Sequence, residues 1–256
     1  MKTWTIVNQK GGVGKTTTAV SLAGSLVNQG YKVLIVDLDP QGSLTVYLRV
    51  KQSATVGLYD YFLAPDDKNV SDLIAKTSIP KVDVIPGSKT LATLDREFGN
   101  AQGKGLVIKQ LCRSLIGQYD YVLIDCPPVL GVLMVNGLTA ADVIVIPTQT
   151  EFLALEGLKN MLSTLQLLQP LLNSQAKIKI IATMFDRRLK ACQKAFLMLK
   201  EAHSEMLWRG YIPVDTKFRD ASEKGQPINL LNPASRGSFA YDKLSNDLVN
   251  LSLKSL

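Results

Sequence analysis

The stretch NQKGGVGKTT, residues 8–17, decides how this chain folds. A β-prone run from Trp4 to Val7 precedes the stretch, and helical periodicity from Val20 to Val27 follows it. Glycines let the backbone form a concavity whose N–H groups point at an anion, and a helix start adds its positive dipole end. We expect Lys15 to reach the β- and γ-phosphates of a ligand and Thr16 to bind Mg²⁺. The stretch therefore predicts a strand–loop–helix unit that holds phosphate.

The spacing departs from the standard P-loop string G-x-x-x-x-G-K-[ST] at one position. Gln9 stands where the first glycine of that string belongs, and Lys10 precedes the glycine pair Gly11-Gly12. The alternative is a glycine-rich turn without a ligand, but the following lysine and threonine favour phosphate binding. Two lysines close together repel unless a polyanion lies between them, so Lys10 indicates a ligand with several negative charges.

Composition places the chain among ordinary globular proteins. It has 256 residues, 46% hydrophobic and 20% charged, with a net charge of +7. No apolar run approaches the ~18 residues of a membrane-spanning helix, and no signal-peptide core follows Met1. Cys112, Cys126 and Cys192 are too widely spaced for a disulfide framework or a metal site. These features predict a cytoplasmic protein.

β-prone runs alternate with helical patterns, which is typical of an α/β fold. The predicted later strands are 32–37, 82–85, 121–124, 143–146 and 178–182. The predicted later helices are 106–116, 154–168, 187–205 and one from residue 244 to the end. Apolar strands separated by helices predict a mostly parallel, doubly wound sheet with helices on both faces. We see no linker or repeat, so residues 1–256 are expected to form one P-loop domain.

Carboxylates end two of the predicted strands. Asp37 and Asp39 follow one strand, and alternation along it would put both on the same side. Asp125 ends the strand in YDYVLID. Because ligands of parallel sheets bind at the carboxyl ends of strands, these acids are candidates for holding Mg²⁺ beside the loop. The alternative for each acid is a solvated loop carboxylate.

The string KGGVGKTT resembles the deviant Walker A motif of the ParA/MinD ATPase family. The resemblance implies a P-loop NTPase fold, ATP and Mg²⁺ as cofactors, and a homodimer in which Lys10 touches the partner's nucleotide. It also implies that Asp39 positions the attacking water, Asp37 supports the metal and Asp125 is the Walker B acid. The residues that it implies for the phosphates are Gly11, Gly12, Val13, Gly14, Lys15, Thr16 and Thr17.

Later blocks, such as VDLDPQGSLT and GLTAADVIVIP, are similar to the ParA branch in family order. Met184 and Pro213 match family segments that flank adenine. The string RDAS, where partition proteins commonly read AEAP, is closer to the ParC type encoded with chemotaxis genes. The resemblance implies a slow, partner-stimulated bacterial ATPase, nucleoid-associated or polar, that positions a partition complex or a chemoreceptor array. Its adaptor would be ParB-like or chemotaxis-associated.

Basic residues concentrate between residues 177 and 200, a stretch that contains seven lysines and arginines and a single acidic residue, Asp186. Such a surface suits a polyanion, although a solvated helix face is the alternative. In the family, positions matching Arg188 and Lys217 bind DNA without sequence preference, and Arg219 is expected to widen that patch. No helix-turn-helix segment precedes the loop. The alternative functions are a MinD-like scaffold on membranes and, less favoured, a P-loop ligase.

Overall fold

One sheet organises the fold. The computed structural model describes residues 1–50, 56–98 and 104–253. Within these ranges, seven strands pair in the order β3-β4-β2-β5-β1-β6-β7, and only the β3–β4 pair is antiparallel. The strands are β1 (Lys2–Ile6), β2 (Val33–Asp37), β3 (Ala75–Lys76), β4 (Val82–Ile85), β5 (Tyr121–Asp125), β6 (Val143–Gln149) and β7 (Lys177–Thr183). The predicted, mostly parallel sheet is confirmed.

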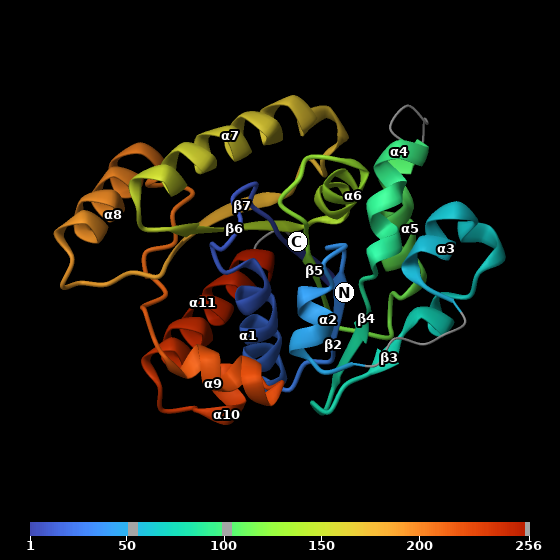
Figure 1. The fold of residues 1–256 in the computed structure, drawn as a ribbon, viewed down its shortest axis with the longest axis horizontal. Coiled ribbons are helices and arrows are strands. Elements are labelled where there is room, and N and C mark those ends of the chain that lie inside the picture. Colours follow the sequence, from blue (N-terminus) through green and yellow to red (C-terminus); the bar gives the residue numbers. More distant parts are fainter. Residues whose placement is uncertain (51–55, 99–103, 254–256) are drawn as a thin grey trace.

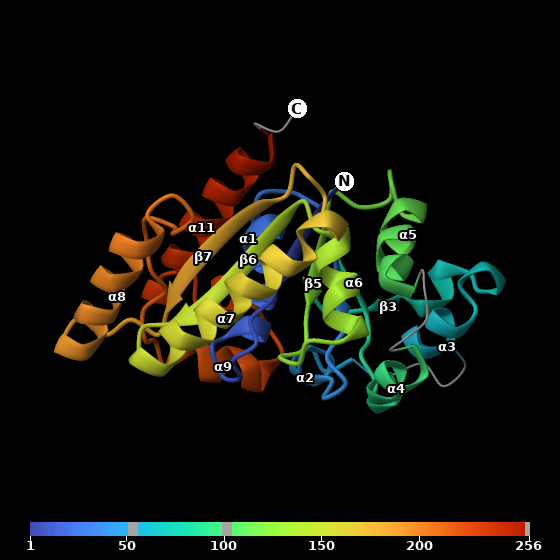
Figure 2. The same ribbon diagram turned by 90° about the horizontal axis from the view of Figure 1, so that it is seen from above.

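Helices cover both faces of the sheet (Figures 1 and 2). One face carries α1 (Lys15–Asn28), α2 (Ser43–Tyr47), α9 (Lys217–Lys224), α10 (Ile228–Leu231) and α11 (Arg236–Leu253). The other carries α3 (Leu58–Leu63), α4 (Leu94–Phe98), α5 (Val107–Ser114), α6 (Val132–Ala140), α7 (Phe152–Leu168) and α8 (Lys190–His203). Short 3₁₀ helices span Pro65–Asp67, Val70–Leu73, Lys89–Thr93, Lys104–Leu106 and Gln169–Leu171. The doubly wound α/β architecture is therefore confirmed.

Successive residues of a strand pack on opposite faces of the sheet, because side chains alternate along a β-strand. In β2, Val33 and Ile35 join the core beneath α1 and α11. Leu34 and Val36 join the core beneath α5 and α6. All five residues of β2 are buried, as expected for a parallel strand covered on both sides. This burial explains why the strand is continuously apolar before its acidic end.

The strand order places three chain segments at one edge of the sheet. β5 lies between β1 and β2, and β6 lies on the other side of β1. Asp125 at the end of β5 is in register with Ile6 of β1 and with Asp37 of β2. Ligands of open α/β sheets bind at the carboxyl ends of strands where the order reverses in this way. The loop after β1 therefore meets both acidic strand ends.

Several predicted boundaries were wrong in the second half of the chain. α8 begins at Lys190 instead of residue 187, because residues 187–189 form a turn before it. α6 was not predicted, since its apolar residues show no polar face and resemble a buried strand. α11 begins at Arg236, eight residues before the predicted start, where small and polar residues hide the apolar stripe. The last residues of that predicted helix, 254–256, lie outside the described part of the chain.

The C-terminal helix packs on the core, as expected from its weakly charged sequence. α11 lies against α1, and its Leu244 and Leu248 are buried. The Trp4 indole Nε1 donates a hydrogen bond of 3.0 Å to Ser252 Oγ near the end of α11. Across the described ranges, no helix has both the length and the apolar character needed to cross a membrane.

Gly24, in the middle of α1, allows a close contact with the segment that leads into α10. A Cβ at Gly24 would lie 2.3 Å from Asn229 Oδ1 and 2.4 Å from Pro227 Cβ. We expect Gly24→Ala to lower the free energy of unfolding by about 1–3 kcal/mol, because overpacking outweighs the better helix propensity of alanine. Urea denaturation measures this change. The control Asn28→Ala, at the exposed end of α1, should stay within about 0.5 kcal/mol of wild type; equal midpoints for both variants would contradict the prediction.

Candidate nucleotide site

The loop after β1 has the backbone conformation that its glycines predict. Gly12 and Gly14 adopt left-handed φ angles of 76° and 93°, which L-residues with side chains rarely adopt. Gly14 is the N-cap of α1, so the positive end of that helix dipole faces the loop. A Cβ built at Gly11, Gly12 or Gly14 meets no heavy atom within 4 Å. The concave side of the loop is therefore open to a ligand.

Lys15 is the first residue of α1 and is buried. Its Nζ donates a hydrogen bond of 3.3 Å to the carbonyl oxygen of Lys10. Burial lowers the pKa of Lys15, and the nearby carboxylates of Asp125 and Asp39 oppose this shift. A buried ammonium held by one carbonyl gains from an anionic ligand, so Lys15 suits the phosphate role predicted for it.

Thr16 and Asp125 meet directly below the loop. Thr16 Oγ1 donates a hydrogen bond of 2.7 Å to Asp125 Oδ2. Asp125 Oδ1 is buried and has no hydrogen-bond partner in the described part of the chain. Burial raises the pKa of Asp125, and the Asp37 carboxylate adds to the shift. A carboxylate oxygen left unpaired in the interior is costly unless a cation binds it. These two residues therefore fit a divalent cation.

Asp37 is fully buried and braces the chain that leaves β2. Its Oδ2 accepts hydrogen bonds from the Thr45 backbone N at 2.9 Å and from Thr45 Oγ1 at 2.7 Å. Its Oδ1 accepts one from the Asp39 backbone N at 3.2 Å. Burial raises the pKa of Asp37 to about 6, although these hydrogen bonds oppose the shift. Asp37 thus anchors α2 at the edge of the site, and its predicted role at the metal stays a prediction.

Asp39 lies two residues beyond the end of β2, so strand alternation does not decide on which side its carboxylate lies, and a shared side with Asp37 stays a prediction. β2 ends at Asp37, and the alternation of a strand does not extend past that residue. Asp39 is half-buried, and its Oδ1 accepts a hydrogen bond of 2.9 Å from the Gln41 backbone N. Burial lowers the pKa of Lys15, and the charge of Asp39 opposes this shift. Asp39 is therefore near the phosphate loop and open to solvent.

A cavity of about 570 Å³ adjoins the loop, a size within the range of small-molecule sites. Gly14 and Thr17 line it from the loop side. Met184 and Pro213, predicted beside adenine, line it from the segments that follow β7 and α8. The structure therefore brings these four predicted residues around one space.

Sequence reasoning missed several residues of this cavity. Thr183, at the end of β7, lines it and donates a hydrogen bond of 2.9 Å to the Val13 carbonyl of the loop. Phe218 and Tyr241 line it from α9 and α11. Arg219, which was expected on a DNA surface, also lines it. The path of the C-terminal third brings these positions to the loop, and the local sequence does not specify that path.

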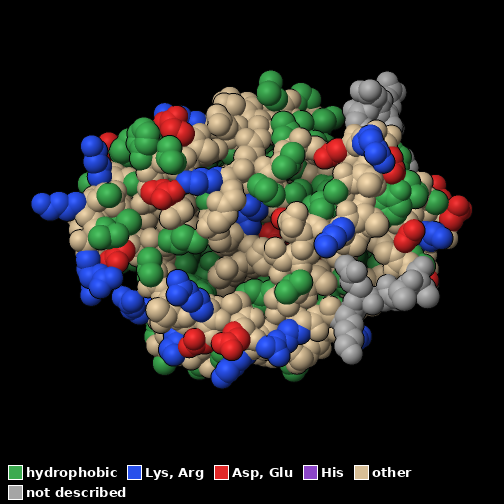
Figure 3. All heavy atoms as spheres, viewed as in Figure 1, with side chains coloured by type: hydrophobic (Ala, Val, Ile, Leu, Met, Phe, Trp, Pro, Cys, Tyr) green, Lys and Arg blue, Asp and Glu red, His purple; other side chains and the backbone are tan. Residues whose placement is uncertain are grey.

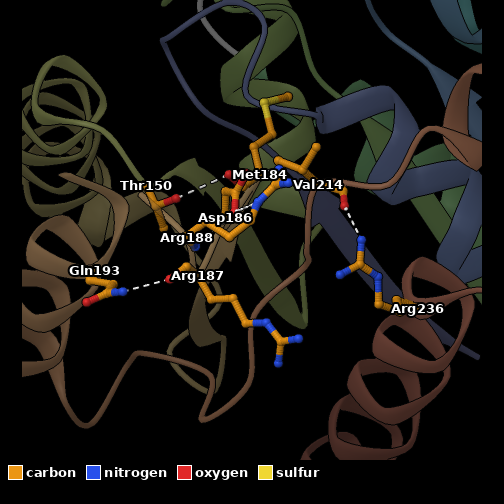
Figure 4. A network of polar contacts seen from close by, with 8 residues as sticks. All are labelled: Thr150, Met184, Asp186, Arg187, Arg188, Gln193, Val214 and Arg236. Atoms are coloured by element: carbon orange, nitrogen blue, oxygen red, sulfur yellow. Dashed lines mark hydrogen bonds and ion pairs between the residues drawn. The ribbon is translucent and has the colours of Figure 1, made fainter. Parts of the chain in front are cut away.

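Arg188 and Lys217, the other two residues predicted to bind DNA, are each ion-paired with an aspartate. Arg188 Nη2 lies 2.7 Å from Asp186 Oδ2, and Lys217 Nζ lies 2.8 Å from Asp220 Oδ2. Both side chains are exposed. Figure 4 shows Arg188 folded back toward Asp186, while the side chain of Arg187 extends away from the network.

Lys10, the first lysine of the loop, pairs with an acid of its own subunit. Its Nζ forms an ion pair with Glu151 Oε1 at the start of α7. The Lys10 ammonium is therefore directed at Glu151, while its carbonyl oxygen accepts the hydrogen bond from Lys15 Nζ.

Comparison with known proteins agrees with this geometry. A family described as an AAA domain matches residues 1–178. The sporulation initiation inhibitor protein Soj of Bacillus subtilis is 38% identical over 245 residues, which cover 95% of this chain and 96% of Soj. The chromosome partitioning protein ParA of Caulobacter vibrioides is 35% identical over 249 residues, which cover 96% of this chain and 92% of ParA.

A solved structure extends the agreement to the whole fold. Cobyrinic acid a,c-diamide synthase from Mycobacterium smegmatis, with bound ADP and magnesium, is similar with a TM-score of 0.83 and 31% identity. The similarity covers 97% of this chain and 94% of that one. The glycine loop, the acids at the strand ends, the strand order and these relatives show that the chain belongs to the ParA/Soj branch of the ParA/MinD family of P-loop ATPases.

Proposed function

We propose that this ATPase is a nucleotide-gated dimer switch that binds DNA without sequence preference and positions or segregates a cellular cargo. Its cofactors are ATP and Mg²⁺. The observation that carries the proposal is a buried Asp125 oxygen beside Thr16, below the glycine loop with its two lysines, that has no hydrogen-bond partner in residues 1–50, 56–98 and 104–253. All of residues 1–256 act as one ATPase domain in this proposal, because a single sheet supports both the loop and the cavity.

The loop residues hold the triphosphate in this proposal. Backbone N–H groups of residues 11–17 and the Lys15 ammonium bind phosphate oxygens, and Met184 and Pro213 enclose the base. Thr16 and Asp125 hold Mg²⁺, with Asp37 bracing that end of the site. Bound Mg²⁺ supplies charge neutralisation at the phosphates.

Asp39 is the residue that positions the attacking water. It is half-buried at the edge of the phosphate loop, so its carboxylate can contact both solvent and a bound γ-phosphate group. Its hydrogen bond from the Gln41 backbone N orients one oxygen. The intrinsic turnover is slow, and an adaptor protein stimulates it.

We expect Asp39→Ala to lower ATP hydrolysis about 100-fold or more, because it removes the group that orients water. ATP-dependent dimers should persist in this variant, since the phosphate-binding residues remain. Phosphate release with Mg²⁺ and ATP, together with light scattering, measures both properties. The control Asp66→Ala changes an exposed acid in the 3₁₀ helix Pro65–Asp67 and should hydrolyse ATP normally. Wild-type hydrolysis by Asp39→Ala would remove Asp39 from this role.

In this proposal, the dimer forms through the face that carries the glycine loop, at the carboxyl ends of the parallel strands. Gly11 and Gly12 present open backbone there, which lets a second subunit approach the nucleotide closely. Large apolar side chains are exposed after β5 and at the start of α7. They are Val129 (64% exposed), Leu130 (49%), Phe152 (66%) and Leu153 (68%). Exposed apolar side chains near a ligand loop support a protein interface at this face.

We expect Gly11→Val to abolish ATP-dependent dimerisation while the monomer stays folded. A Cβ at Gly11 meets nothing within 4 Å in the monomer, so the valine conflicts only with a partner subunit. Size-exclusion chromatography with ATP tests dimerisation, and thermal melting tests folding. Gly12→Val differs because its φ of 76° makes any side chain strained, so it should also lower the melting temperature. Dimers of normal affinity from Gly11→Val would refute close approach at this loop.

DNA binds along a surface that we define as the α8 basic surface. It comprises Arg187, Arg188, Lys190, Lys194 and Lys200, all exposed. Figure 3 shows basic side chains gathered along the edge of the molecule formed by α8 and again over α9. Lysine and arginine contacts to phosphates fit binding without sequence preference.

The two arginines of this surface differ in their contacts. The Arg187 guanidinium has no hydrogen bond or ion pair to any described residue, whereas Arg188 is paired with Asp186. Arg187 and Arg236 both line a cavity of about 480 Å³ on the far side of Pro213 from the loop. Asp186 and Val214 line both this cavity and the nucleotide cavity. This shared lining supports coupling between nucleotide binding and DNA binding at the α8 basic surface.

We expect Arg187→Glu and Arg188→Glu each to weaken binding of an arbitrary duplex by about 5- to 10-fold in the ATP state. Each loses one phosphate contact and adds repulsion, so the salt slope should also fall by about 1. Fluorescence anisotropy over a salt series measures both quantities. Arg113→Glu, an exposed arginine on α5 at the other end of the molecule, is the control. Unchanged affinity in both α8-surface variants would refute this DNA interface.

The cargo is a partition complex or a chemoreceptor array, linked through a ParB-like or chemotaxis-associated adaptor. Partition is supported by the names of the relatives Soj and ParA, and the array rests on the RDAS string. The protein acts in the bacterial cytoplasm, at the nucleoid or the cell pole.

The MinD-like alternative needs a C-terminal helix free to bind lipid, but the hydrogen bond between Trp4 and Ser252 holds α11 against the core. Two assays, each run with and without ATP, separate these two functions. ATP-dependent co-sedimentation with liposomes supports the membrane scaffold, whereas ATP-dependent retention on DNA supports the DNA-binding switch.

A further inference from the structure

Lys10 is held within its own subunit by several contacts. Its Nζ pairs with Glu151 Oε1, and the two side chains are only 25% and 44% exposed. Its backbone N donates a hydrogen bond of 3.0 Å to Asn8 Oδ1, which fixes the direction in which the side chain leaves the loop. The Lys10 ammonium is therefore directed at the start of α7.

Helix α7 lacks a side chain where Lys10 lies against it. A Cβ at Gly157 would lie 3.3 Å from Lys10 Cβ and 3.8 Å from Lys10 Cδ. Gly157 thus leaves room for the aliphatic stem of Lys10, one turn and a half along α7 from Glu151. The stem packs on the helix while the ammonium meets the acid, as long cationic side chains commonly do.

The same contacts reach the nucleotide site. The carbonyl oxygen of Lys10 accepts the hydrogen bond from Lys15 Nζ. Glu151 lines the nucleotide cavity together with Gly14 and Thr17. The ion pair therefore connects α7, the phosphate loop and the cavity wall, and a polyanion bound in the loop would compete with Glu151 for the Lys10 ammonium.

We propose that Glu151 is a positioning residue that retains Lys10 in its own subunit until the dimer forms. This inference rests on the proposed dimer, in which Lys10 reaches the partner's nucleotide. Lys10 must leave Glu151 to do so, and the free energy of the broken ion pair is subtracted from that of dimerisation. Glu151 thus sets the protein concentration at which ATP drives pairing.

The first test measures whether Glu151 restrains Lys10 in the nucleotide-free monomer. Glu151→Gln removes the charge but keeps the shape, and Glu156→Gln is its matched control, since Glu156 on the same helix pairs with Lys159. An amine-reactive ester, read out by peptide mass spectrometry, reports the labelling rate of Lys10. We expect Lys10 to react about 2- to 5-fold faster in Glu151→Gln, the range for a partly exposed ion pair. The control should label Lys10 at the wild-type rate.

The second test measures the consequence for pairing. Sedimentation equilibrium with a saturating non-hydrolysable ATP analogue and Mg²⁺ gives the dimer dissociation constant of each protein. We expect this constant to fall about 2- to 5-fold in Glu151→Gln and to stay unchanged in Glu156→Gln. Saturation with the analogue removes any effect of Glu151 on nucleotide affinity.

The outcomes separate this inference from the proposed function. If the wild-type protein does not dimerise with the analogue, the dimer switch is wrong, and the labelling rate alone decides whether Glu151 restrains Lys10. If the wild type dimerises but Glu151→Gln matches its control in both tests, the restraint is refuted. Weaker dimerisation of Glu151→Gln would also refute it, because Glu151 would then stabilise the dimer itself.

Discussion

The burial of opposite charges at the carboxyl ends of the parallel strands is the constraint on which the rest of the structure depends. Asp125 is buried, with one carboxylate oxygen bound by Thr16 and the other without a hydrogen-bond partner among the described residues. Lys15 is buried beside it, and its ammonium donates a hydrogen bond to the Lys10 carbonyl oxygen. Neither group would be stable there alone, because unpaired charge in the interior is costly. Their placement makes sense as half of a site that a phosphate ligand and its metal complete.

The sheet supplies this arrangement because three strands end together. Asp125 is in register with Asp37 on one neighbour and with Ile6, just before the loop, on the other. Close packing keeps these ends fixed. A Cβ at Gly87 would lie 2.8 Å from Asp37 Cγ, and one at Gly137 would lie 2.4 Å from Cys126 Sγ. Cys126, which follows Asp125 in the chain, is therefore closely packed against Gly137.

The two lysines of the loop differ in burial and in their partners. Lys15 is buried at the start of α1. Lys10 keeps partial exposure and a carboxylate partner outside the loop, so it can change partners at little cost. A pair of lysines with these different environments suits one constant and one conditional contact. The nucleotide cavity has a mixed wall of loop, β7 and C-terminal residues, and it shares Asp186 and Val214 with the cavity that Arg187 lines.

Local sequence alone determined the parallel sheet, the phosphate loop and the acids at the strand ends, because β-periodicity, glycine conformation and strand-end position are local properties. It also marked Met184 and Pro213, although only through family resemblance. Tertiary structure alone decided that Thr183 holds Val13, that α11 completes the cavity, and that Glu151 meets Lys10. Lys10 and Glu151 are 141 residues apart in the sequence, and Val13 and Thr183 are 170 residues apart. Contacts of that range depend on how strands are ordered in the sheet, which no local pattern specifies.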